Sequence, residues 1–106
     1  MGTPRSEKQK IVVKVDPELA GIIPAFLSNR DGDVRTLRLA CSQSDYETIR
    51  CLGHGMKGAG GGFGFDVVTE LGARLEDAAK AGNLQEIQIQ LDALVDYLDR
   101  LEVVYE

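Results

Sequence analysis

Residues 53–65, with the sequence GHGMKGAGGGFGF, constrain the fold more than any other segment, because seven of them are glycine. As a motif, Gly53, Gly55 and Gly58 fit the G-x-G-x-x-G pattern of dinucleotide-binding loops, which follow a strand in a βαβ unit. The preceding residues, SDYETIRCL, have a helical periodicity instead, and the phosphate-loop pattern G-x-x-x-x-G-K-[ST] is absent. We therefore expect the glycines to lie on a helix rather than in a nucleotide site.

The apolar residues around this segment predict which way His54 points. On a helix over residues 45–63, at about 100° per residue, the apolar stripe with Leu52 and Met56 lies almost opposite His54. The face of the histidine then carries Glu47, Arg50, Cys51, Lys57, Gly58, Gly61 and Gly62.

Glycines on that face destabilise the helix, because each one lowers helix stability by about 1 kcal/mol relative to alanine. Close approach of a neighbouring helix would explain Gly60 and Gly53, which point partly inward, but it does not explain glycines on a solvated face. A bare surface beside an exposed histidine predicts that another macromolecule docks there.

The N-terminal part of the chain predicts a tail over residues 1–10 and a single domain over residues 11–106. The β-branched run IVVKV at 11–15 has no evident partner strand, so we interpret it as an extended leader that packs Ile11, Val13 or Val15 onto the domain. Asp16 followed by proline and glutamate is typical of a helix start.

The remaining chain predicts an all-α fold, an antiparallel four-helix bundle preceded by a short N-terminal helix. The first long helix covers about 24–42, with two helices broken at 31–33 as the alternative. A capping box at Ser44-x-x-Glu47 opens the second helix, which we expect to end at Gly64. The third covers about 65–81 before a glycine cap at Gly82, and the fourth opens at Asn83, with an apolar seam that continues to Tyr105.

Composition limits the partners and the compartment. The net charge of −5 argues against nucleic acid, because phosphate backbones attract basic surfaces. No apolar run reaches the roughly 18 residues of a membrane span, and the first residues lack the apolar middle of a signal peptide. Cys41 and Cys51 fit free thiols, and with a single histidine they make a poor metal site. We expect a cytoplasmic protein without a metal of its own.

The segment His54-Gly-Met-Lys57-Gly58, with small residues up to Gly64, resembles the H-x-[LM]-K-G-x(5)-G signature of histidine phosphotransfer (HPt) domains. The resemblance covers roughly residues 18–104. It includes Phe26-Leu27-x-x-Arg30, Asp45-Tyr46-x-x-Ile49-x-x-Leu52 and Leu75-Glu76-x-Ala78-Ala79. The glycine density departs from the family pattern, since members usually carry Ser or Thr at position 55.

This resemblance implies a phosphorelay intermediate without an ATP site of its own. His54 would accept a phosphoryl group from the aspartate of a response-regulator receiver domain, and donate it to such an aspartate. Lys57 would stabilise the phosphoryl group, Gly58, Gly61 and Gly62 would leave room for the partner, and Arg50 would add local positive charge. The partners that the resemblance implies are a response-regulator receiver domain, which would supply Mg²⁺, and/or a hybrid sensor histidine kinase.

The sequence leaves several alternatives open. The chain could be a helical interaction module that binds a receiver or a sensor kinase without being phosphorylated. We expect a monomer, because each helix offers a matching apolar stripe. A free-standing protein and an excised domain of a sensor kinase have the same sequence pattern, and the direction of phosphate flow leaves no trace in it.

Overall fold

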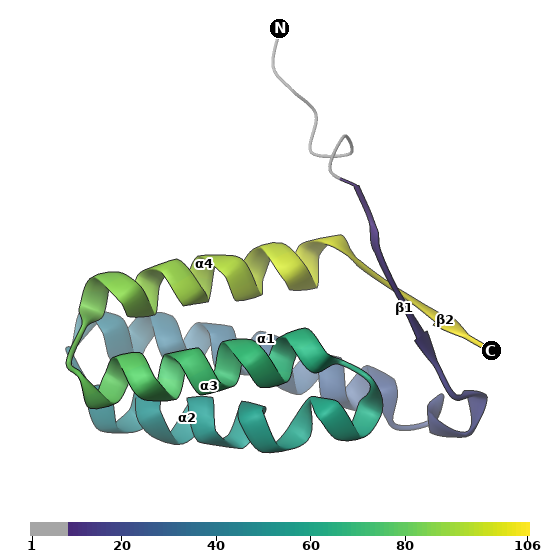
Figure 1. Cartoon of the computed structure of the whole chain (residues 1–106), viewed down its shortest axis with the longest axis horizontal. Helices are drawn as coiled ribbons and strands as arrows, with labels where there is room; N and C mark the ends of the chain where they lie inside the picture. The colour runs from purple at the N-terminus through teal and green to yellow at the C-terminus, as the bar shows by residue number, and fades with distance from the viewer. Residues whose placement is uncertain (1–8) are drawn as a thin grey trace, which may run out of the picture.

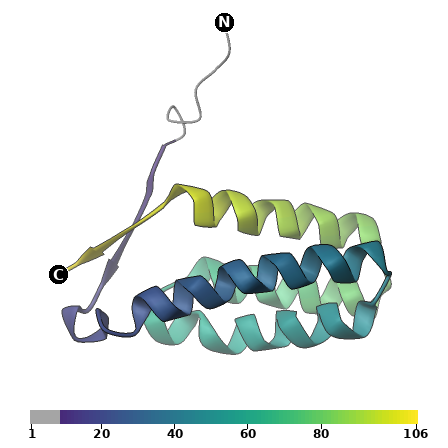
Figure 2. The same ribbon diagram turned by 180° about the vertical axis from the view of Figure 1, so that it is seen from behind.

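The structure is a computed structural model that describes residues 9–106, so most of the predicted tail at 1–10 lies outside the described residues. It is mostly helical, with four α-helices: α1 (Ile23–Ser42), α2 (Tyr46–Ala59), α3 (Asp66–Lys80) and α4 (Leu84–Arg100). The helices lie side by side along the longest axis of the molecule (Figure 1), and the view from behind shows the same arrangement (Figure 2). None of the helices within residues 9–106 has the length and apolar character that crossing a membrane requires.

The core lies between the helices and contains one side chain or more from each of them. The fully buried members are Ile23, Leu37, Ile49, Met56, Phe65, Val68, Leu75, Ile87 and Leu94. Phe26 of α1 stacks on Phe65 at a centroid distance of 5.2 Å and meets the edge of Phe63 at 5.1 Å. These three rings join the start of α1 to the turn between α2 and α3.

The helix boundaries confirm one prediction and correct two others. α1 is a single helix, so the alternative break at 31–33 is wrong. Asp45, not Ser44, caps α2, because its carboxylate accepts the Thr48 backbone N–H at 3.2 Å while Ser44 adopts a left-handed φ of 53°. α2 ends at Ala59 rather than Gly64, and a 3-10 turn, η3 (Gly61–Phe63), follows it. Gly61 and Gly62 therefore do not lie on the histidine helix.

A small parallel sheet departs from the predicted all-α fold. Strand β1 (Ile11–Val15) pairs with β2 (Leu101–Tyr105), with Ile11 opposite Leu101 and Val15 opposite Tyr105. The leader thus has a partner strand, and the helical seam predicted up to Tyr105 stops at Arg100. Val15 is buried, and Ile11 and Val13 pack against the core as the leader prediction requires.

Between β1 and α1, Asp16 caps a short 3-10 turn, η2 (Pro17–Leu19), by accepting the Glu18 N–H at 2.9 Å. At the other end of the chain, Asn83 caps α4 as expected, with its side chain accepting the Glu86 N–H at 3.1 Å.

Candidate functional site

His54 projects from the outer side of α2. Its side chain is 69% exposed, whereas Ile49 and Met56 on the same helix are almost completely buried. This is the orientation that the helical phase of the sequence predicts. The imidazole is therefore open to a partner over most of its surface.

Glycines bring α3 unusually close to the helix that carries the histidine. A Cβ atom on Gly53 would lie 2.7 Å from the carbonyl oxygen of Gly72 and 2.7 Å from the backbone nitrogen of Glu76. A Cβ on Gly72 would lie 2.5 Å from the backbone nitrogen of Lys57. Because real Cβ atoms do not approach other atoms so closely, only glycine permits this contact. It places the side chain of Glu76 beside His54.

Glu76 is the buried partner of the histidine. Its side chain is only 7% exposed, and its Oε2 lies 3.1 Å from Nδ1 of His54. Lys57 reaches the other carboxylate oxygen, Oε1, at 3.4 Å, and Lys80 lies 3.8 Å from Oε2. One carboxylate from α3 thus holds the histidine and two lysines in a single cluster.

The surroundings of Glu76 keep it ionised. Its burial opposes the charged form, but the hydrogen bond from His54 and the charges of Lys57 and Lys80 outweigh that effect, so the pKa of Glu76 lies below its ordinary value. An ionised carboxylate can only accept hydrogen bonds. The proton of the neutral imidazole therefore resides on Nδ1, which donates to Glu76, and the lone pair resides on Nε2.

The other predicted site residues divide into three groups. Lys57 joins the cluster, with a side chain that is 51% exposed. Gly58 has open space where a side chain would stand, and so do Gly55 and Gly62. Arg50 is paired with Glu47 through its Nε atom at 3.1 Å, so its charge is largely neutralised within its own helix.

Gly61 is exposed, but a Cβ added to it would stand in ordinary contact with the Thr69 hydroxyl of α3, at 3.6 Å. The glycines from Gly58 to Gly62 therefore do not form one continuous strip along a helix, because α2 ends at Ala59. Gly60 serves close packing, as predicted, because its Cβ would stand 2.7 Å from the carbonyl oxygen of Phe65.

Sequence reasoning assigned no role to Glu76 or to Lys80. A signal for Glu76 was available, because it falls on the apolar stripe of α3 between Leu75 and Ala79, where an acid is costly unless it has partners. The partners come from another helix, so their identity required the packing of α2 on α3. Once Glu76 is recognised, Lys80 can be predicted as its partner, because it lies one turn further along the same helix.

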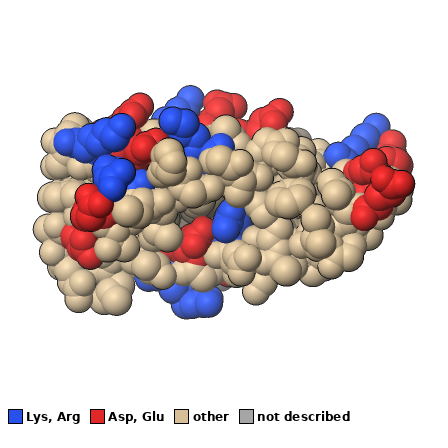
Figure 3. Space-filling view, turned by 90° about the horizontal axis from the view of Figure 1, so that it is seen from below, with Lys and Arg blue, Asp and Glu red and all other residues tan. Residues whose placement is uncertain are grey.

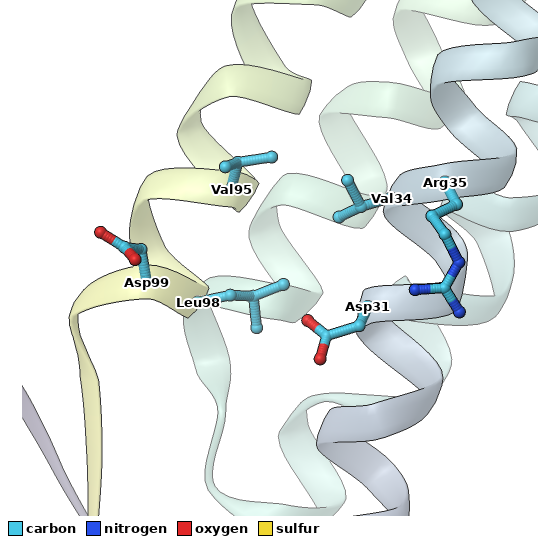
Figure 4. Close-up of a pocket in the computed structure, with 6 residues that line it drawn as sticks. All are labelled: Asp31, Val34, Arg35, Val95, Leu98 and Asp99. Carbon is cyan, nitrogen blue, oxygen red and sulfur yellow. The ribbon is translucent and has the colours of Figure 1, made fainter.

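The imidazole of His54 lies on the surface, with 69% of its side chain exposed. Seen from below, the side of the molecule on which α2 lies has a broad uncharged area to the right of centre (Figure 3). Charged groups lie toward its ends, along its upper edge, at its lower edge and in a small pair near the centre. A hollow of about 520 Å³ lies elsewhere, between α1 and α4, and Figure 4 shows its lining. It is lined by Asp31, Val34, Arg35, Val95, Leu98 and Asp99. An imidazole exposed to this degree, outside the lining of that hollow, suits a macromolecular partner better than a small substrate.

The fold and the site together define a helical bundle that presents one exposed histidine, oriented by a buried carboxylate. The chain belongs to the Hpt domain family, whose family model matches residues 22–103. This confirms the resemblance drawn from the sequence, and it places the chain among the histidine phosphotransfer domains of two-component signalling. A comparison with curated proteins found no match, and a comparison with solved structures found none either.

Removing Glu76 is expected to slow phosphoryl transfer by about tenfold to a hundredfold, by analogy with the carboxylates that orient metal-binding histidines. Glu76→Met removes both the acceptor and the charge, whereas Glu76→Gln keeps an oxygen that can accept the Nδ1 proton. We therefore expect transfer rates in the order wild type, Glu76→Gln, Glu76→Met. Nitrogen-15 NMR of His54 should show the Nδ1–H tautomer in the first two proteins and a mixture in the third. Equal rates and equal tautomer populations in all three would refute the positioning role.

Proposed function

We propose that His54 is a phosphoryl carrier that exchanges its phosphoryl group with the aspartate of a response-regulator receiver domain. The observation that carries the proposal is the contact between His54 Nδ1 and the ionised Glu76, which leaves the Nε2 lone pair directed away from Glu76 on an exposed ring. Only a neutral imidazole nitrogen with a free lone pair can attack phosphorus. The single histidine of the chain has that arrangement.

In the proposed step, Nε2 attacks the phosphorus of an aspartyl phosphate in line with the bond that breaks. A P–N bond forms, and the aspartate carboxylate leaves with the electron pair of the P–O bond. The proton on Nδ1 stays on the ring, which gains a positive charge that the adjacent Glu76 balances. No base is needed in this direction, and the reverse step returns the phosphoryl group to a receiver.

The surroundings of His54 suit the charge and the size of the transferred group. Lys57 and Lys80 keep about half of each side chain exposed, at 51% and 58%, so their ammonium groups can reach phosphoryl oxygens beside the ring. Gly58 leaves open space one turn from the histidine. The Mg²⁺ ion that such transfers use would come with the receiver domain, and it supplies charge neutralisation at the phosphoryl oxygens when bound.

The direct test is transfer from a panel of phosphorylated receiver domains to the purified chain. We expect label to appear on the chain in an acid-labile, alkali-stable form, as for phosphohistidine, and the chain offers only His54 for it. A hybrid sensor kinase that ends in a receiver should serve as donor in the same way. If a receiver binds but no label moves, the chain is an interaction module and the proposal is wrong.

A further inference from the structure

The ribbon of β1 and β2 presents an edge that the bundle does not use. The backbone N–H of Glu106 donates to the carbonyl of Val15 at 3.1 Å, so Val15 directs its backbone groups toward β2. Because alternate residues of a parallel ladder face alternate sides, Glu102 and Val104 face β1. Val103 and Tyr105 then direct their N–H and C=O groups away from β1.

The two outer edges of the ribbon differ. On β1, the carbonyl oxygen of Lys14 stands 3.9 Å from the Cβ position of Gly64, so the turn before α3 lies against that edge. On β2, no hydrogen bond within residues 9–106 involves the outward backbone groups of Val103 or Tyr105. In Figure 2 the element drawn across β2 is its partner strand β1, and both strands extend away from the helices. Among the residues that the structure describes, the open edge is that of β2.

The sequence of β2 offers little protection against pairing, because Glu102 is its one charged residue. Proteins usually blunt an edge strand with proline, lysine or a bulge, and LEVVY contains neither residue and pairs without a bulge. Tyr105 is 40% exposed, and Val12 on the neighbouring strand is 54% exposed. A two-stranded sheet is marginal alone, and parallel strands are usually found within larger sheets. Side chains on one face of the ribbon pack against the bundle core, but within residues 9–106 no third strand extends the sheet beyond β2.

We infer that a second copy of this chain pairs along β2, with the two β2 strands antiparallel across a two-fold axis at Val103. The N–H and C=O of Val103 then exchange hydrogen bonds with those of Val103 in the second copy. Leu101 lies opposite Tyr105, which pairs an aliphatic with an aromatic side chain. The result is a four-stranded sheet in which the two β1 strands form the outside.

Self-complementarity is the reason for choosing a second copy as the occupant. In this register Glu102 lies opposite Val104, so no like charges stand directly across from each other. The two Glu102 side chains are diagonal neighbours at roughly 7–8 Å, the one unfavourable pair, so added salt should tighten the dimer. The sequence-based expectation of a monomer rests on the apolar stripes of the helices alone. It does not consider the edge of β2, because the sequence did not predict that strand.

Dimerisation along β2 leaves the phosphoryl site free. His54 belongs to α2 and not to the ribbon, and its side chain remains 69% exposed in the single chain. The dimer would present two histidines on separate bundles. Failure of this inference and failure of the proposed function are thus separable, because phosphoryl acceptance and association are measured independently.

Sedimentation velocity over a concentration series tests the pairing with three variants. Val103→Pro removes the central outward N–H donor of β2 without removing a ladder bond to β1, since proline is tolerated where the N–H faces outward. Losing one such bond from each copy should weaken dimerisation by roughly tenfold to a hundredfold. Val12→Pro, which removes an outward donor from β1, is the matched control and should dimerise like the wild type. Glu102→Gln should dimerise more tightly.

Circular dichroism establishes first that each variant keeps its helices. If Val103→Pro does not fold, Tyr105→Pro removes the next outward donor of the same edge and takes its place. A wild-type chain that stays monomeric throughout the series overturns the inference. It is also overturned by a dimer that survives Val103→Pro, which would point to the hollow between α1 and α4, or by one that is lost in Val12→Pro.

Discussion

Replacing His54 with glutamine is expected to abolish phosphoryl acceptance completely, from phosphorylated receivers and from the small donor phosphoramidate alike. Glutamine has no nitrogen lone pair that can attack phosphorus, and the chain has no second histidine to substitute for it. Because the substitution removes the hydrogen bond from Nδ1 to the buried Glu76 carboxylate, the free energy of unfolding should fall by about 0.5–1.5 kcal/mol. Labelled phosphate on the protein and a urea titration measure the two effects.

Arg74→Gln is the matched control for this variant. Arg74 is an exposed residue of α3 that pairs with Glu70 at 3.6 Å and not with the cluster around Glu76. It should accept phosphate as the wild type does. Label that persists in His54→Gln would show that another residue carries the phosphoryl group, and loss of receiver binding in that variant would assign the histidine to docking as well.

Gly72→Ala is expected to destabilise the protein by about 2–3 kcal/mol, the cost typical of overpacking a tight contact. The added Cβ would stand 2.5 Å from the backbone nitrogen of Lys57 and 2.7 Å from the carbonyl oxygen of Gly53. Backbone atoms cannot rotate away as a side chain does, so α2 and α3 must separate. For a domain of this size the melting temperature should fall by roughly 10–20 °C in a calorimetric scan.

Gly55→Ala is the counterpart on an open surface. No atom lies within 4 Å of its Cβ position, so alanine should stabilise α2 by up to about 1 kcal/mol through its higher helix propensity. The two substitutions are chemically identical, and opposite signs are expected. A melting temperature for Gly72→Ala within about 2 °C of the wild type would mean that the helices do not pack as closely as described.

The orientation of His54 followed from local periodicity, and for that reason the sequence could predict it. The stripe through Ile49 and Met56 defines the buried side of α2, and a histidine almost opposite that stripe must face outward. The continuity of α1 across residues 31–33 was predictable for the same reason. These inferences depend on neighbours within a few turns, where the sequence is informative.

The features that escaped prediction depend on contacts between distant residues. β1 and β2 lie at opposite ends of the described chain, and the spacing of Leu98, Leu101 and Tyr105 continued a helical seam convincingly. Only the β-branched pair Val103–Val104 signalled a strand. Glu76 was missed because its role depends on α2 packing against α3. The glycines were understood in part: Gly53 and Gly60 serve that packing, while Gly58 remains open.

The measurement that tests the central claim most directly is phosphorus–nitrogen NMR of the nitrogen-15-labelled chain after phosphorylation. With Glu76 holding Nδ1 at 3.1 Å, the phosphoryl group should be bonded to Nε2 of His54, and the coupling between phosphorus and that nitrogen should show it. A phosphoryl group on Nδ1, or no phosphohistidine with any receiver or with phosphoramidate, would contradict the account.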